Sequence, residues 1–247
     1  MSNLNLCLHC GSKEASREEI EATPTPASTR TWTPIPHNRL INLVETTLGD
    51  SGFSVVNEAH ALWGDGLRYF GLMEVKNGSS HNDYGLIVGL RNSHDKSIPA
   101  GLALGSGVFV CDNLSFSSEV TLARRHTRFI ERDLPEVVTR SVGRLTDLRG
   151  KQDQRIEAYK ATEISDQAAH DLIIRSIDSQ VAPVTQVPAV LKEWRNPRHA
   201  EFAADGKTGW RLFNAFTEAL KGRNLAKLPR RTQSLHGLLD AACGLVV

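Results

Sequence analysis

Apolar residues recur at helical spacing between residues 38 and 48, and this pattern predicts an amphipathic helix. Asn38 is suited to be its N-cap, and Gly49 is suited to end it. Before this helix, residues 12–21 predict a short charged helix. The proline-rich residues 22–36 predict an extended strap that lies on the domain surface. The apolar face of the main helix is formed by Leu40, Ile41, Val44 and Leu48.

Alternation of apolar and polar side chains replaces the helical spacing after this helix. It is clean over residues 67–76 and rough over 53–62, and apolar runs follow at 84–90 and 102–111. Glycine-containing turn signals separate the first three runs, so we predict four antiparallel strands joined as a meander. One face of such a sheet packs on helices, and the other is left to solvent or to a ligand.

The strand pattern stops after Phe116, and the rest of the chain is predicted to be helical. Residues 117–119, two serines and a glutamate, are expected to open a long helical region that runs to about residue 168. Near the C-terminus, one helical face is predicted to pack in the core rather than bind a ligand. It holds Trp210, Phe213 and Thr217.

The predicted fold class is α+β: a helix followed by an antiparallel β-meander packed against long helices, with a helical C-terminal region. A chain of 247 residues can bury a substantial core without metal or disulfide cross-links. The predicted organisation is an N-terminal arm over residues 1–36 and an α+β core domain over 37–165. A helical C-terminal region over 166–247 is expected to pack on that core.

The net charge of +1 hides an uneven distribution of basic residues. The segment 121–160 carries a net charge of +4, and 192–231 carries +6. Positive charge therefore collects in the helical half of the chain, where it could meet phosphate groups.

No apolar run approaches the roughly 20 residues that span a bilayer, and residues 1–10 lack the features of a signal peptide. We therefore expect a cytoplasmic protein with no membrane partner. Cys7 and Cys10 have the spacing of half a zinc site, but no second pair completes four ligands. No cofactor is predicted, and a divalent metal is expected only if the protein is an enzyme.

Polar residues gather where two predicted strands end, at residues 91–96 and 111–113. A histidine beside an aspartate can act as a base or a metal ligand, and a nearby cysteine can act as a nucleophile. No spacing matches a known catalytic signature. The same residue types also cap turns and satisfy buried backbone groups, so a structural hydrogen-bond network stays open as the alternative. The candidate catalytic residues are His94, Asp95, Cys111, Asp112 and His126.

A second cluster is basic and falls at the start of the predicted long helical region. Four arginines there could neutralise phosphates along one helical face, supported by Arg91 and Lys96 at the strand ends. A solvated helix face paired with acidic neighbours is the alternative. The four arginines are Arg124, Arg125, Arg128 and Arg132, and bases could stack on Tyr69, Phe70 or Tyr84 if one of these faces the open side of the sheet.

Several long motifs resemble a phage- and plasmid-related family of unknown function over nearly the whole chain. The motifs are PTPxxTxTWxPIPH at Pro24–His37, GLRNSHDKS at Gly89–Ser97, GxxVFVCDNLxFS at Gly105–Ser117, RRHT at Arg124–Thr127 and WRLFNAFTE at Trp210–Glu218. This resemblance implies an association with mobile DNA. It supplies no activity and no site residues.

The order of elements is also similar to the core of the Rad52-like single-strand annealing proteins. In that family, single-stranded DNA lies in a basic groove between the sheet and helices of a ring of subunits. The likeness implies that residues 77–80 and 124–132 would lie near a bound strand, and it leaves a homo-oligomer open. Residues 89–111 have no counterpart in that family.

The leading hypothesis is therefore a mobile-element protein that binds nucleic acid, with single-stranded DNA favoured, in replication, recombination or defence avoidance. An enzyme that acts on a nucleotide or nucleic acid through the His/Asp/Cys cluster is the alternative. A third hypothesis is an interaction protein that counters a host defence, which an exposed apolar patch would indicate.

Overall fold

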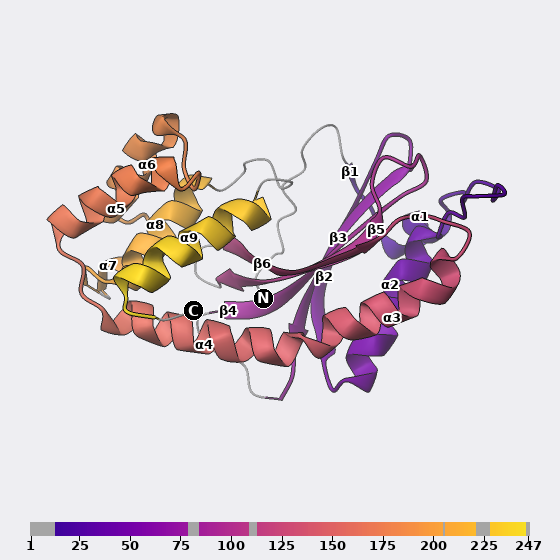
Figure 1. Cartoon of the computed structure of the whole chain (residues 1–247), viewed down its shortest axis with the longest axis horizontal. Helices are drawn as coiled ribbons and strands as arrows, with labels where there is room; N and C mark the ends of the chain where they lie inside the picture. Colours follow the sequence, from indigo (N-terminus) through magenta and orange to yellow (C-terminus); the bar gives the residue numbers. More distant parts are fainter. Residues whose placement is uncertain (1–12, 79–83, 109–112, 205, 221–227, 246–247) are drawn as a thin grey trace. The chain divides into compact units, whose positions relative to one another are not determined.

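The structure is a computed structural model, and the fold is α+β (Figure 1). The residues that it describes are 13–78, 84–108, 113–204, 206–220 and 228–245. The chain divides into two compact units, which are described separately below. The first comprises residues 1–106 and 119–146, and the second comprises 107–118 and 147–247.

Two helices precede the sheet of the first unit. Helix α1, Arg17–Glu21, begins at a capping box in which Ser16 and Glu19 each bond the backbone of the other. Helix α2 spans His37–Asp50, so it starts one residue before Asn38, the predicted N-cap. The N-cap is Pro36 rather than Asn38, because the proline ring holds its φ at −53° and its extended ψ of 140° leads directly into the helix.

Six strands form one sheet in sequential order, and the strands are antiparallel. They are β1 Lys13–Glu14, β2 Ser54–Trp63, β3 Arg68–Lys76, β4 Tyr84–Ser93, β5 Ala100–Val108 and β6 Asn113–Arg124. The predicted turn between β2 and β3 is confirmed. Gly64, Asp65 and Gly66 all have positive φ there, which matches the right-handed twist of the hairpin. Tyr69 on β3 pairs with Leu62 on β2 and with Asn92 on β4.

The segment that begins at Ser117 was predicted to be helical, and this prediction is wrong. Strand β6 continues through it to Arg124, and the next helix begins at Ile130. β6 lies beside β5 so closely that a Cβ on Gly101 would come within 2.9 Å of the Leu122 carbonyl oxygen. Pairing with β5 therefore outweighs the local helix-start signal of the two serines and the glutamate.

Helix α3, Ile130–Gly143, follows β6 and lies beside α2, and α2 in turn contacts β2 and β4 (Figure 1). The apolar residues of the three layers meet in a buried core. Its members include Ile35, Leu40, Val44, Met73, Val88, Ile130, Leu134 and Val138, each no more than 2% exposed. The strap before α2 is thereby held down by Ile35, as its sequence predicted.

Apart from residues 107–118, which include part of β6, the described residues of the second unit are mainly helical. The helices are α4 Leu145–Ala161, α5 Asp166–Asp178, the short 3-10 helix η1 Val184–Gln186, α6 Val187–Arg195, α7 Ala200–Ala204, α8 Gly209–Leu220 and α9 Leu228–Ala242. Trp210 and Phe213 of α8 stack at 5.5 Å between ring centroids in the core, which confirms their predicted packing role. α4 and α9 are joined by a buried ion pair, in which Arg155 Nε lies 3.0 Å from Asp240 Oδ2. In the part of the chain that the structure describes, no helix combines the length and apolarity needed to cross a bilayer.

Candidate functional site

A buried polar network lies at the end of β4, in the first unit, and Asn92 is its centre. The Asn92 side chain is fully buried. Its Nδ2 donates to the Ile35 carbonyl oxygen at 2.7 Å and to His37 Nδ1 at 2.9 Å, and its Oδ1 accepts from His126 Nε2 at 2.8 Å. His94 Nε2 donates to the same Ile35 oxygen at 3.0 Å. The network therefore joins the strap, α2, β4 and the loop after β6.

The hydrogen bonds define the protonation of His37. Because Asn92 donates to Nδ1, this nitrogen must be unprotonated, and Nε2 carries the proton that it donates to the Gly66 carbonyl oxygen at 2.9 Å. Burial, together with smaller electrostatic effects of His94 and His126, lowers the pKa of His37 to about 4, although the hydrogen bond to Gly66 acts to raise it. His37 is thus a neutral structural link between the start of α2 and the β2–β3 turn.

His94 and His126 share this environment. His94 stacks on His37 with 3.9 Å between ring centroids, and both side chains are less than 10% exposed. Burial lowers the pKa of His94, and it lowers the pKa of His126 to about 4, where the charge of His94 acts in the same direction. Both imidazoles are therefore neutral at pH 7, and their Nε2 atoms are occupied by protein acceptors.

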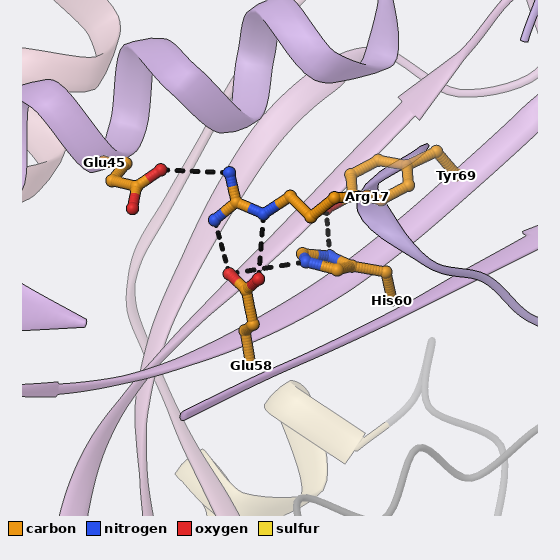
Figure 2. A network of polar contacts seen from close by, with 5 residues as sticks. All are labelled: Arg17, Glu45, Glu58, His60 and Tyr69. Carbon is orange, nitrogen blue, oxygen red and sulfur yellow. Dashed lines mark hydrogen bonds and ion pairs between the residues drawn. The ribbon is translucent and has the colours of Figure 1, made fainter. Parts of the chain in front are cut away.

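A second polar network connects α1 to the sheet, and Figure 2 shows Arg17 lying between the carboxylates of Glu45 and Glu58. The Arg17 Nε donates to Glu58 at 2.8 Å, and a second nitrogen of the same guanidinium contacts Glu45 at 3.0 Å. Next to Glu58, the buried His60 Nδ1 lies 2.9 Å from the Tyr69 hydroxyl. Burial raises the pKa of Tyr69 well above its usual range and lowers that of His60. The fully buried Tyr69 hydroxyl has no path to a substrate.

The candidate catalytic residues do not all meet at one place in the described structure. His94 and His126 belong to the Asn92 network, whereas Asp95 faces Arg68, whose Nε lies 2.6 Å away. Although burial acts to raise it, the pKa of Asp95 is lowered to about 2 by hydrogen bonds from Ser97 and Arg68. Cys111 and Asp112 lie outside the described residues. His94 and His126 are thus members of a buried hydrogen-bond network in the described structure.

A divalent metal was expected only if the protein is an enzyme. Within the described ranges, no group of three or more His, Cys, Asp or Glu side chains is placed to hold a metal ion. The Cys7–Cys10 pair lies outside those ranges.

The basic residues predicted to share one helical face occupy a corner instead. Arg124 ends β6, Arg125 and Arg128 lie in the loop that follows, and only Arg132 is on α3. The prediction of a single helical face is therefore wrong, because the chain turns between the strand and the helix. Arg124 and Arg132 both bond Asp133. Neither Arg125 nor Arg128 has a carboxylate partner among the described side chains, and both are exposed.

An exposed aromatic residue lies inside this corner, and the sequence analysis missed it. Phe129 is 41% exposed, and the guanidinium carbons of Arg128 and Arg132 lie 4.5 and 4.8 Å from its ring centroid. Such cation–π contacts hold guanidinium planes against an aromatic face. The spacing Arg-Phe-x-x-Arg was visible in the sequence as a basic segment with an aromatic residue inside it. We call Arg124, Arg125, Arg128, Phe129 and Arg132 the arginine corner.

The other residues predicted to bind nucleic acid are placed differently. Lys96, in the β4–β5 turn, lies over the ring of Trp32 in the strap, with its Nζ 4.9 Å from the ring centroid. Arg91 is half-buried on β4 and is paired with Phe70 on β3.

Two of the three residues that were expected to stack on bases are buried. Tyr69 and Tyr84 are no more than 3% exposed, so neither can stack on a base, and Phe70 is half-buried.

The network of Asn92, His94 and His126 anchors two surface segments at one end of the first unit. They are the loop that carries Arg125 and Arg128 and the turn that carries Lys96. His126 lies between Arg125 and the other loop residues and bonds Asn92, while His94 lies two residues from Lys96 and bonds the strap. In Figure 1 the start of α3 lies at the same end of the sheet as the β2–β3 and β4–β5 turns. The buried polar residues thus position an exposed basic and aromatic surface.

One comparison with known proteins gives a match. The model of a family described as "Domain of unknown function (DUF932)" matches residues 27–241, which is most of the chain. No curated protein and no solved structure matches the sequence.

Proposed function

The chain belongs to the DUF932 family, whose function is unknown, and we propose that it binds single-stranded nucleic acid at the arginine corner. The observation that carries this proposal is the exposed Phe129 ring, which has the guanidinium groups of Arg128 and Arg132 at 4.5 and 4.8 Å from its centroid. Proteins that bind single strands combine basic groups that follow the backbone with flat groups on which bases stack. Both kinds of group are present here within five consecutive residues.

The charges of the corner favour phosphate. Its four arginines outnumber the two carboxylates in the adjoining sequence, Glu131 and Asp133, and Glu131 is paired with Arg39. Arg124 and Arg132 share Asp133, and this leaves Arg125 and Arg128 as exposed cations without an acidic partner in the described structure. Arginine presents a planar fork of donors that matches phosphate oxygens, and its plane also stacks on bases.

The position of the corner is determined by buried contacts. His126 is 8% exposed and is hydrogen-bonded to Asn92, so the loop that carries Arg125 and Arg128 is anchored in its middle. An anchored loop loses less conformational entropy when it binds a ligand than a free loop does. Open base faces are found on single strands, whereas in a duplex they are stacked inside. We therefore favour a single strand over duplex as the ligand.

The motifs that resemble phage- and plasmid-related proteins support DNA over RNA, and a role in recombination or replication. The likeness of element order to the Rad52-like annealing proteins supports a homo-oligomer that aligns several arginine corners along one strand, and this is part of the proposal. Strand binding of this kind needs no cofactor.

The test is fluorescence anisotropy with a labelled single-stranded oligonucleotide over a salt series, with RNA and duplex DNA of the same sequence for comparison. Affinity for the single strand should fall steeply as salt increases. Arg128→Ala should reduce the slope of log affinity against log salt by about 1. Phe129→Ala should weaken binding by about 1–3 kcal/mol with little change in that slope, because it removes stacking and no charge.

Arg140→Ala is the matched control, because Arg140 is exposed on α3, is paired with Glu136 and lies outside the corner. It should bind like the unmodified protein. Binding that does not change with salt, or an equal loss for the Arg128 and Arg140 variants, would show that the corner is not the site.

A further inference from the structure

A groove lies between α2 and α3, next to the arginine corner. It has a volume of about 380 Å³ and is lined by Ile35, Asn38, Arg39, Asn42, Leu43, Thr46, Glu131, Leu134 and Pro135. This volume is within the range of small-molecule sites, and the mixture of apolar walls with a few polar groups is typical of them. All of these residues belong to the first unit.

Three polar residues of α2 line the groove in a row. Asn38, Asn42 and Thr46 follow each other at intervals of four residues, so they lie on one face of the helix. No side-chain hydrogen bond to Asn38 or Asn42 occurs within the described residues, whereas Asn92, which is buried, uses both ends of its amide in the protein. Each of the two groove amides can therefore donate and accept hydrogen bonds to a ligand.

The groove also has an apolar part. Pro135 of α3 is exposed there and Leu43 of α2 is half-buried, whereas Leu134 and Ile35, which also line the groove, belong to the buried core. A flat aromatic ligand can place a face against this apolar part while its polar edge meets the two amides. Water alone would satisfy the amides, but it would leave the apolar part uncovered.

One lining residue of the groove is a neighbour of the arginine corner in the sequence. Glu131 lines the groove and lies two residues after Phe129 and directly before Arg132. At the rim, Arg39 is paired with Glu131 at 2.6 Å, and both side chains are 52% exposed. Exposed ion pairs contribute little to stability, so Arg39 can exchange the carboxylate for a phosphate with little loss.

From these contacts we propose that the groove binds one unpaired base of a strand held at the arginine corner, and that Asn38 and Asn42 read the edge of that base. The inference rests on the proposed function and identifies a specificity subsite for it. The base that an asparagine amide recognises best is adenine, to which it can make two hydrogen bonds at N6 and N7. The subsite therefore makes binding dependent on the base, whereas the arginine corner responds to the backbone.

The experiment compares three labelled single strands of equal length, oligo(dA), oligo(dT) and a strand of abasic nucleotides, at one salt concentration. The unmodified protein should bind oligo(dA) most tightly. Asn42→Ala should lower the affinity for oligo(dA) by about 5-fold or more and leave the affinity for the abasic strand unchanged. The salt dependence should remain that of the unmodified protein, since no charge is removed.

Asn42 is exposed, so its replacement is compatible with folding, and a thermal melt of each variant verifies this. Asn196→Ala is the matched control, because Asn196 is an exposed asparagine at the end of α6, in the second unit, and does not line the groove. It should bind all three strands normally.

The outcomes separate the two proposals. If the unmodified protein binds and Arg128→Ala weakens binding, but Asn42→Ala changes neither oligo(dA) nor abasic affinity, only the base subsite is overturned. An equal loss on both strands would also overturn it, because an edge-reading amide has nothing to contact on an abasic strand. If no strand binds at low salt, the proposed function fails and the subsite fails with it.

Discussion

Replacing Asn92 with alanine should destabilise the protein strongly, and the size of the effect follows from its hydrogen bonds. The change removes the donor to His37 Nδ1 and the acceptor for His126 Nε2, both of which are buried. The Ile35 carbonyl oxygen is less affected, because His94 also donates to it. A buried polar group that loses its partner costs about 1–3 kcal/mol, so two such groups cost about 2–6 kcal/mol.

This cost is large compared with the 5–15 kcal/mol that typically separates folded from unfolded proteins. Urea denaturation followed by circular dichroism measures the free energy of unfolding of Asn92→Ala beside that of the unmodified protein. Asn196→Ala is the surface control, and its free energy of unfolding should change by no more than about 0.5 kcal/mol. A loss below about 1 kcal/mol for Asn92→Ala would refute the reasoning, because it would mean that neither histidine depends on the amide.

Asn92→Asp separates hydrogen bonding from side-chain volume. The carboxylate keeps an acceptor for His126 but cannot donate to His37 at neutral pH. A protonated His37 could donate to the carboxylate, so the pKa of His37 should rise in this variant. Its stability deficit relative to the unmodified protein should therefore become smaller as the pH falls. A deficit that stays constant with pH would contradict this expectation, because it would show that protonated His37 gains no bond to the carboxylate.

Two further predictions concern pH and a close contact in the sheet. The free energy of unfolding should decrease as the pH falls from about 6.5 to about 4, because the pKa values of His37 and His126 are about 4 in the folded protein and the unfolded chain binds more protons in this window. The slope of the free energy of unfolding against pH should approach about 1.4 kcal/mol per pH unit for each histidine. Urea denaturation that gives equal free energies of unfolding at both ends of this pH window would contradict the prediction. Gly71→Ala should cost about 1–3 kcal/mol, since its Cβ would lie 2.1 Å from the Tyr69 hydroxyl oxygen. Gly49→Ala is the control, because its Cβ would meet no atom within 4 Å, and this variant should melt at or above the temperature of the unmodified protein. An unchanged melting temperature for Gly71→Ala would show that Tyr69 can move away.

Most elements of the first unit could be predicted from local sequence. The apolar spacing of residues 40–48 predicted α2, and the glycines at 64 and 66 predicted the β2–β3 turn. Both signals are local, because they depend on periodicity and on backbone conformations that glycine favours. The predictions failed at β6, where pairing with β5 overrides a helix-start signal, and at β1, a strand of two residues with no periodicity to detect.

The candidate site was predicted in composition but not in arrangement. The sequence identified the arginines at 124–132 as candidates for binding phosphate. Their helical spacing, however, could not reveal the turn between β6 and α3. Phe129 was overlooked because an isolated phenylalanine is more often buried than exposed. The groove between α2 and α3 could not be predicted at all, since it requires two helices separated in sequence by strands β2 to β6 to lie side by side.

The sequence by itself determined the α+β class, the position of the β2–β3 turn, the uneven charge and the residue types available for binding. Only the tertiary structure decided which polar residues meet. Asn92 bonds Ile35, which lies 57 positions earlier, and His126, which lies 34 positions later. Periodicity specifies which face of an element is buried, but it does not specify which buried polar atoms will share a site. That choice depends on the register of the sheet and on the path of the strap, both of which are set by packing across the whole unit.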